Sequence, residues 1–173
     1  LSTHYFYAAA HDLGWRFSVI AGDRACDKYA NVEAAEFYRR ALECARRVDE
    51  IPTGDLARVM ESLGDVSEVS GRYEDAASCY GRARKLVRDA RDDTVRLLRK
   101  EGVVRERMGQ YRDALRWYSR GLRVVEDATD ADAVSARAQL SLAYAAVRHR
   151  QGRYSQSVSW AERAVGDAEF SND

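Results

Sequence analysis

Proline is almost missing from this chain of 173 residues, since Pro52 is the only one. Because proline interrupts helices, a chain this poor in it can be helical over nearly its whole length. No apolar stretch approaches the roughly eighteen residues that a membrane-spanning helix needs. The net charge is zero. A neutral chain argues against a protein dedicated to nucleic acid, because phosphate contacts need an excess of lysine and arginine.

Cysteine is also scarce. Cys26, Cys44 and Cys79 form no C-x-x-C pair and have no histidine at ligand spacing. Such isolated thiols are typical of a reduced, cytoplasmic protein. Hydrophobic residues make up 46% and charged residues 32% of the chain, which indicates a folded domain. Because the chain starts at Leu1 without a signal-peptide pattern, we expect it to be a fragment of a larger protein.

What the chain does contain is a repeat. Residues 71–76, 109–114 and 152–157 share the pattern Gly, polar, Tyr, polar, polar, small, and residues 29–34 form a degenerate copy. The copies lie roughly forty residues apart, a period typical of helical-repeat proteins. A glycine that recurs in this place predicts a left-handed turn at the end of a helix.

Helical periodicity flanks each of these turns. Apolar residues recur every three or four positions, as in Ala76, Tyr80 and Ala83, which is the pattern of an amphipathic helix. Alternating, strand-like runs are missing, so we expect no sheet. The spacing predicts helices over residues 2–11, 15–28, 31–49, 55–70, 74–90, 94–108, 112–127, 132–151 and 155–169.

Small residues predict where the two helices of each pair cross, because close approach needs a small side chain on one side. The alanines expected at these crossings are Ala34, Ala76 and Ala114. On the preceding helices we expect Gly64 and Gly102 to lie opposite them. The tyrosines expected to fill the wider gap further along are Tyr38, Tyr80 and Tyr118.

The second copy carries these features most completely, in Met60, Leu63, Gly64, Gly71, Tyr73, Ala76, Tyr80 and Ala83. This set resembles the tetratricopeptide repeat. The resemblance implies an all-α fold, a right-handed α-solenoid of antiparallel helix pairs with about nine helices. It implies a single repeat domain over residues 1–173, with repeats at about 15–48, 57–90, 95–128 and 138–171. Two features depart from the family: the spacing is longer than about 34 residues, and the proline that ends each repeat is missing.

The first part of the chain carries a narrower resemblance. Residues 21–25, 29–34 and 38–42 are similar to the start of helical arrays in large bacterial signalling proteins. Those arrays form the C-terminal part of multidomain ATPases, some with an adenylate/guanylate cyclase domain, and of transcriptional regulators. The resemblance therefore implies a regulatory, protein-binding module of such a parent.

In repeats of this family the first helix of each pair lines the concave face. The residues that the resemblance places there are Arg58, Glu61, Asp65, Arg96, Arg99, Lys100, Val103, Leu142, Ala146 and His149. We expect this face to bind a partner protein, a peptide or a neighbouring domain of the parent chain, with no direct contact to nucleic acid or membrane. A homodimer is possible, because the ends of a repeat array expose apolar surface. The alternative is a peptide- or small-ligand-sensing domain of a transcriptional regulator.

Catalytic and metal-binding patterns are missing. The chain has neither G-x-x-x-x-G-K-[ST] nor G-x-G-x-x-G, and its three histidines lie on different predicted segments or two turns apart. We therefore expect no enzyme activity, no cofactor and no metal. The acidic stretch Glu126, Asp127, Asp130, Asp132 lacks the glycine and final glutamate of a calcium loop. It is interpreted as a helix end, a connector and the first turn of the next helix.

One local imbalance of charge stands out between residues 95 and 125. The basic residues are Arg96, Arg99, Lys100, Arg105, Arg107, Arg112, Arg116, Arg120 and Arg123, against Glu101, Glu106 and Asp113. This excess is either a solvated helix face or an anion-facing patch that steers an acidic partner. Trp160 is open to two interpretations as well, a core residue or an exposed contact anchor.

Overall fold

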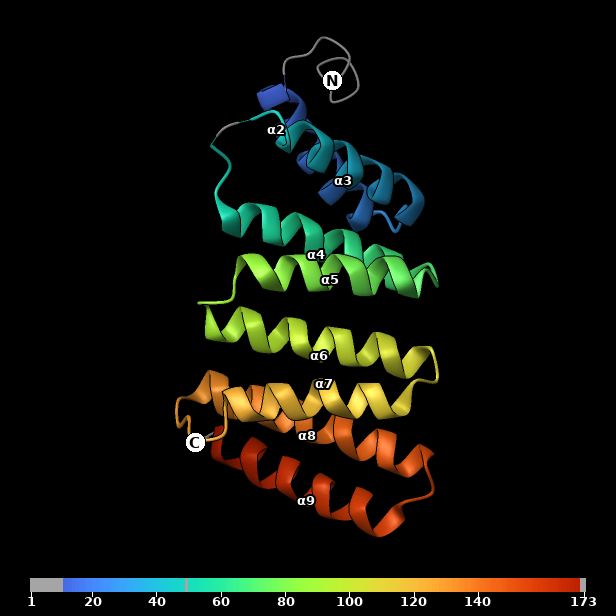
Figure 1. Cartoon of the computed structure of the whole chain (residues 1–173), viewed down its shortest axis with the longest axis vertical. Coiled ribbons are helices and arrows are strands. Elements are labelled where there is room, and N and C mark those ends of the chain that lie inside the picture. The colour runs from blue at the N-terminus through green and yellow to red at the C-terminus, as the bar shows by residue number, and fades with distance from the viewer. Residues whose placement is uncertain (1–10, 49, 172–173) are drawn as a thin grey trace. The chain divides into compact units, whose positions relative to one another are not determined.

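The computed structural model describes residues 11–48 and 50–171, which form eight α-helices and no β-strand (Figure 1). The helices are α2 (His11–Asp27), α3 (Asn31–Ala45), α4 (Thr53–Val69), α5 (Tyr73–Leu86), α6 (Arg91–Arg107), α7 (Tyr111–Val124), α8 (Ala131–Arg150) and α9 (Tyr154–Ser171). The predicted all-α class is confirmed. The helix predicted over residues 2–11 lies, except for its last residue, outside the described part of the chain.

One predicted boundary is wrong. The sequence predicts a break between residues 11 and 15, but α2 runs through these positions without interruption. Gly14 lies on the buried side of α2, next to the core residue Trp15. Gly14 is therefore an interior residue of the helix, despite the low helix propensity of glycine.

The chain divides into two compact units, one up to Val87 and one from Arg88 onward. The first unit holds the pairs α2–α3 and α4–α5, and the second holds α6–α7 and α8–α9. Within the first unit α3 packs on α4, and within the second α8 packs on both α7 and α6. Each unit is therefore a stack of two helical hairpins.

The tight turn inside each hairpin has the predicted left-handed residue. Gly71, Gly109 and Gly152 have φ angles of 73°, 73° and 71°. In the α4–α5 turn the Arg72 amide donates to the Ser67 carbonyl at 2.8 Å, which satisfies a carbonyl at the helix end. Tyr29 occupies the equivalent place in the first hairpin with φ 57°, where an L residue is strained.

Close approach within three hairpins depends on a glycine and a tyrosine. A Cβ atom built on Gly22, Gly64 or Gly102 would come within 3 Å of a tyrosine ring on the following helix. The rings belong to Tyr38, Tyr80 and Tyr118, all at most 2% exposed. The expected arrangement, with alanines opposite the glycines and tyrosines in a wider gap, is therefore wrong. The flat ring fills the space over the glycine, because a ring face can approach a bare Cα closely.

Each of these tyrosine hydroxyls donates a hydrogen bond to a carboxylate on the preceding helix. Tyr38 donates to Asp23 at 2.8 Å, Tyr80 to Asp65 at 2.7 Å, and Tyr118 to Glu106 at 2.9 Å. Burial, followed by the neighbouring carboxylates, holds the pKa of Tyr80 and Tyr118 far above the usual value for tyrosine. These hydroxyls are therefore neutral donors that lock the register of each pair.

The fourth hairpin is built differently. Ala145 and Ala161 stand where the other pairs have glycine and tyrosine. The Ser157 hydroxyl donates to the Ala145 carbonyl at 2.9 Å, and Tyr144 stacks on Trp160 with ring centroids 4.3 Å apart. The large aromatic contact has thus moved from the buried centre of the pair to its edge.

Candidate binding surfaces

The predicted partner-binding residues lie on the first helices of the second, third and fourth hairpins. Three of them, Arg58, Glu61 and Asp65, lie on α4 in the first unit. Arg58 forms an ion pair with Asp23 at 3.2 Å, and Asp65 accepts the Tyr80 hydroxyl. Arg58 and Asp65 therefore hold α2, α4 and α5 together in addition to any binding role.

The other seven predicted residues lie on α6 and α8, which pack together in the second unit. A cavity of about 280 Å³ lies between these helices, and Arg96 and Arg99 line it from α6. Ser135, Ala136 and Gln139 line it from α8. Arg96 pairs with Asp93 at 2.6 Å. The sequence thus identified two of the residues of a polar cavity between two first helices.

The remaining predicted residues extend the same helices beyond the cavity. Lys100 and Val103 on α6 are half-buried, while Leu142 and Ala146 on α8 are exposed. Leu142 is 60% exposed. His149 is exposed, and its ring lies edge-on to Tyr154 with centroids 5.3 Å apart.

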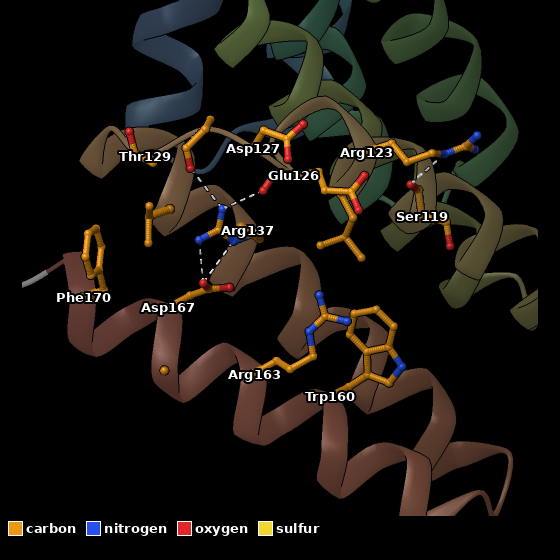
Figure 2. Close-up of a pocket in the computed structure, with 14 residues that line it drawn as sticks. Ser119, Arg123, Glu126, Asp127, Thr129, Arg137, Trp160, Arg163, Asp167 and Phe170 are labelled. Carbon is orange, nitrogen blue, oxygen red and sulfur yellow. Dashed lines mark hydrogen bonds and ion pairs between the residues drawn. The ribbon is translucent and has the colours of Figure 1, made fainter.

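A second surface, which sequence reasoning missed, lies between α7, α8 and α9 (Figure 2). This α7–α9 groove has a volume of about 800 Å³. Figure 2 shows Arg137 in its centre, with Asp167 directly below it on α9 and Phe170 at one end. Trp160 and Arg163 lie at the other end, with the Arg163 guanidinium 4.5 Å from the Trp160 ring centroid.

The Arg137 guanidinium ties three segments together. It donates to the Asp167 carboxylate at 2.7 Å and to the Val125 and Ala128 carbonyls at 3.1 and 3.0 Å. The hydrogen bond to Asp167 raises the pKa of Arg137, so this guanidinium is charged at every physiological pH. Arg137 therefore closes the end of α7 and fixes α9 against α8. A signal exists in the sequence, because the equivalent place in the second hairpin is Leu56, and a charged residue there interrupts the apolar stripe.

The acidic stretch that follows α7 behaves as predicted, as a connector and a helix start. The Asp130 side chain caps α8 by accepting the Ala133 amide at 3.1 Å. It also pairs with Arg91, which donates two hydrogen bonds of 2.8 Å. Arg91, followed by the Ala133 amide, lowers the pKa of Asp130.

The burial of Trp160 lies between the two interpretations, a core residue and an exposed anchor. The residue is half-buried, because one ring face stacks on Tyr144 and Arg163 covers it from outside. It also lines the α7–α9 groove. Trp160 is therefore a packing residue whose edge remains available to a ligand.

Reactive groups are placed where chemistry is unfavourable. The cysteines are unpaired, and burial raises the pKa of the Cys44 and Cys79 thiols. Among the described residues, no three histidine, cysteine or acidic side chains converge on a point where a metal ion would fit. Over the same residues, no helix combines the length and the hydropathy required to cross a membrane.

The stacked hairpins and the glycine–tyrosine register define a helical-repeat protein of the kind that presents binding surfaces. Residues 55–127 match the family model for the tetratricopeptide repeat. The match falls on the second and third repeats that the sequence predicts. No curated protein sequence matches the chain significantly.

Solved structures share the fold at low sequence identity. The Rap conjugation gene regulator of plasmid pLS20, solved with the Phr* peptide, is 16% identical over 88% of this chain, with a TM-score of 0.72. Aspartyl phosphate phosphatase F from Bacillus subtilis is 15% identical over 92%, with a TM-score of 0.77. MamA is 16% identical over 90%, with a TM-score of 0.69. The chain spans 42%, 41% and 78% of these three proteins.

Proposed function

We propose that this chain is a non-catalytic interaction module that binds a peptide or protein partner through the exposed faces of its first helices. The cavity between α6 and α8 is the observation that carries this proposal. It offers two arginines, Arg96 and Arg99, beside the side chains of Ser135 and Gln139. Donors and acceptors in one recess suit a peptide backbone and its side chains.

An exposed apolar row continues from the recess along α8. Leu142 and Ala146 follow Gln139 at helical spacing, so the three lie on one side of α8. Apolar contacts beside a polar recess are the usual anatomy of a peptide site, because burial supplies affinity and polar groups supply orientation. We place Arg58, Glu61 and Asp65 of α4 in the partner-binding set as well, as the family resemblance implies.

A selection experiment tests the proposal directly. Peptides selected from a displayed library on the immobilised chain are measured by calorimetry against Arg96→Glu, Leu142→Asp and the control Arg153→Glu. We expect the first two variants to weaken binding at least tenfold. Each removes a contact and adds a negative charge that was not present when the peptides were selected on the native chain. Arg153 is exposed in the α8–α9 turn, so its variant should bind normally. Failure to enrich any peptide, or equal loss in the control, would contradict the proposal.

The parent protein is part of the proposal. We place the chain as the C-terminal array of a bacterial, cytoplasmic signalling ATPase or adenylate/guanylate cyclase, with residues 1–173 as one domain. The support is the resemblance of residues 21–42 to such arrays. Sequencing the coding DNA upstream of Leu1 tests it, because the ATPase requires a G-x-x-x-x-G-K-[ST] loop in the same reading frame. One calorimetric unfolding transition is expected for a single domain.

The alternative function is a peptide-sensing domain of a transcriptional regulator. The Rap regulator of plasmid pLS20, which shares the fold, was solved with a bound peptide. A DNA-binding domain encoded in the same frame would favour this alternative over the ATPase. Either parent leaves the repeat module itself without turnover, so hydrolysis of ATP or of an aspartyl phosphate by the purified chain would contradict the non-catalytic assignment.

A further inference from the structure

Six arginines line a cavity of about 830 Å³ along α7 and the C-terminal ends of α6 and α8. This arginine face consists of Arg105, Arg112, Arg116, Arg120, Arg123 and Arg148. Five of the six belong to the basic excess that the sequence shows between residues 95 and 125. The fold therefore gathers most of that excess into one hollow rather than spreading it over a solvated helix.

Carboxylates do not neutralise this face. Asp113 is the one acidic residue that lines the cavity, and it pairs with Arg116 at 2.9 Å. Two other guanidinium groups donate hydrogen bonds to uncharged amide oxygens. Arg105 donates to Gln110 Oε1 at 3.0 Å, and Arg148 donates to Gln151 Oε1 at 3.0 Å. These bonds hold the guanidinium groups of Arg105 and Arg148 but do not compensate their charge.

Aromatic rings hold two more of these guanidinium groups in place. Arg120 lies 4.6 Å from the Trp117 ring centroid, and Arg148 lies 5.2 Å from that of Tyr144. Ring contacts orient a guanidinium without neutralising it. The Arg148 Nε atom is buried and has no hydrogen-bond partner among the described residues. A ligand oxygen in the cavity would find donors that are already oriented.

Arginines elsewhere in the chain are treated differently. Arg58, Arg91, Arg137 and Arg150 are paired with Asp23, Asp130, Asp167 and Glu106. The whole chain has 28 basic and 28 acidic residues, so acids to neutralise the arginine face were not lacking. Like charges gathered in one hollow repel each other, and a bound anion relieves this repulsion.

We infer that the arginine face binds an acidic peptide segment of a partner protein. Arg112, Arg116, Arg120 and Arg123 follow one side of α7 over about 16 Å. Arginines four positions apart on a helix are separated by about 6 Å along its axis. Alternate side chains of an extended peptide are about 6.6 Å apart. Aspartate or glutamate at every second position of such a peptide would therefore meet successive arginines, and carboxylate suits the two-pronged guanidinium.

A polynucleotide fits these observations less well. The chain as a whole is neutral, and the basic surface is a single recess about three helical turns long. Nucleic-acid binding relies on an extended basic footprint and an excess of positive charge. The arginine face is made by α7 and by the ends of α6 and α8, and it shares no lining residue with the α6–α8 cavity. It is thus a second binding surface, independent of the proposed function.

Fluorescence anisotropy with a labelled peptide of alternating glutamate and serine, about eight residues long, tests the inference. We expect binding at low salt that weakens as salt is added. The variant Arg112→Glu/Arg120→Glu should lose about tenfold or more in affinity, because two favourable ion pairs become repulsive. The control Arg16→Glu/Arg24→Glu has the same change in net charge at exposed positions of α2 and should bind as the native chain does.

Further controls distinguish binding at the arginine face from binding at the α6–α8 surface. A peptide of alternating glutamine and serine should not bind, and Leu142→Asp should leave binding intact. Circular dichroism checks that each variant remains helical, and Arg112→Gln/Arg120→Gln supplies a milder variant with an expected smaller loss. Absence of binding to the acidic peptide at low salt, or an equal loss in the control, would overturn the inference. So would equally tight binding of single-stranded oligothymidine of the same charge through the same arginines.

Discussion

The groove between α3 and α5 in the first unit and the α7–α9 groove in the second lie at the same place in the repeat. Leu42 lines the first groove and Leu122 the second, at equal distances from their turn residues. The volumes nevertheless differ, at about 380 and 800 Å³. The lining differs too, since buried Cys79 in the first groove corresponds to half-buried Trp160 in the second.

A second difference concerns charge. Arg137 and Asp167 stand where the hairpin of α4 and α5 has Leu56 and Leu86. Leu56 packs on the core of the first unit, whereas Arg137 bonds to Asp167 and to the end of α7. The comparison teaches that the hairpin of α8 and α9, which lacks the buried glycine–tyrosine pair, also differs in the lining of its groove. Residues in the core must fit the facing helix, whereas residues that line a groove can vary and so adapt the groove to a particular ligand.

The largest expected effect tests whether the two units share one packing rule. Gly64→Ala in the first unit and Gly102→Ala in the second should each destabilise the chain by about 3 kcal/mol, because the new Cβ overlaps a buried tyrosine ring. Urea unfolding followed by circular dichroism measures this loss. Gly166→Ala is the matched control, since a Cβ there meets nothing within 4 Å, and alanine favours helix. Equal stability of all three variants would show that the rings yield.

The second effect concerns the charged pair that distinguishes the units. Arg137→Leu should cost about 2 kcal/mol, because it leaves the Asp167 carboxylate and the carbonyls at the end of α7 without their donor. Arg137→Leu/Asp167→Leu restores the residues of the first unit and should recover at least half of the loss. Urea midpoints of the single and double variants decide the matter. A double variant less stable than Arg137→Leu would mean that the groove cannot accept the apolar pair.

Alkaline pH should weaken both units through their tyrosines. Burial raises the pKa of Tyr118 in the folded chain far above its ordinary value near 10. Tyr118 therefore stays neutral in the folded chain while it ionises in the unfolded chain. Its contribution to the free energy of unfolding is complete below pH 10 and is lost as pH rises further. The loss is about 1.4 kcal/mol per pH unit for each such tyrosine.

Tyr118→Phe sharpens this expectation. At neutral pH it should cost about 1 kcal/mol, because the hydrogen bond to Glu106 is lost. Above pH 10 the variant should lose stability less steeply than the native chain, as urea unfolding at several pH values would show. Tyr29→Phe is the control, since Tyr29 is 88% exposed and should leave the slope unchanged. Parallel curves for Tyr118→Phe and the native chain would refute the linkage.

The smallest effect belongs to the capping aspartate of the second unit. Arg91 lowers the pKa of Asp130, so its contribution is present above the ordinary value near 4 and is lost as pH falls below it. Asp130→Asn keeps a capping side chain but removes the ion pair. The stability of this variant should therefore fall less steeply than that of the native chain as pH drops below about 4. Carboxyl NMR titration of the native chain should place the Asp130 pKa below the usual range. A normal value would show that Arg91 does not hold the carboxylate in solution.

Much of the fold follows from patterns along the chain. Apolar residues at helical spacing predict the helices from α3 to α9 to within a few residues, and Gly71, Gly109 and Gly152 predict the turns. These features are local, because they depend on residues only a few positions apart. The break predicted between residues 11 and 15 is wrong, because α2 runs through it and the buried Gly14 lies inside the helix.

The binding surfaces were predictable only in part. The family resemblance placed Arg96 and Arg99 on a concave face, and the structure shows that both line the α6–α8 cavity. The charge excess of residues 95–125 was visible as a count. The count did not show that Arg105, Arg112 and Arg148 share one hollow. Arg148 lies outside that stretch, on α8, and only helix packing brings it to α7.

The sequence by itself determined that this chain forms helical hairpins, because hydrophobic periodicity and left-handed glycines act within a few residues. Only the tertiary structure decided which side chains meet across the helices. Arg137 reaches Asp167 and the end of α7, and Tyr118 reaches Glu106, because packing brings distant turns together. The grooves depend on the same packing, since their volume is the space that neighbouring side chains leave unfilled.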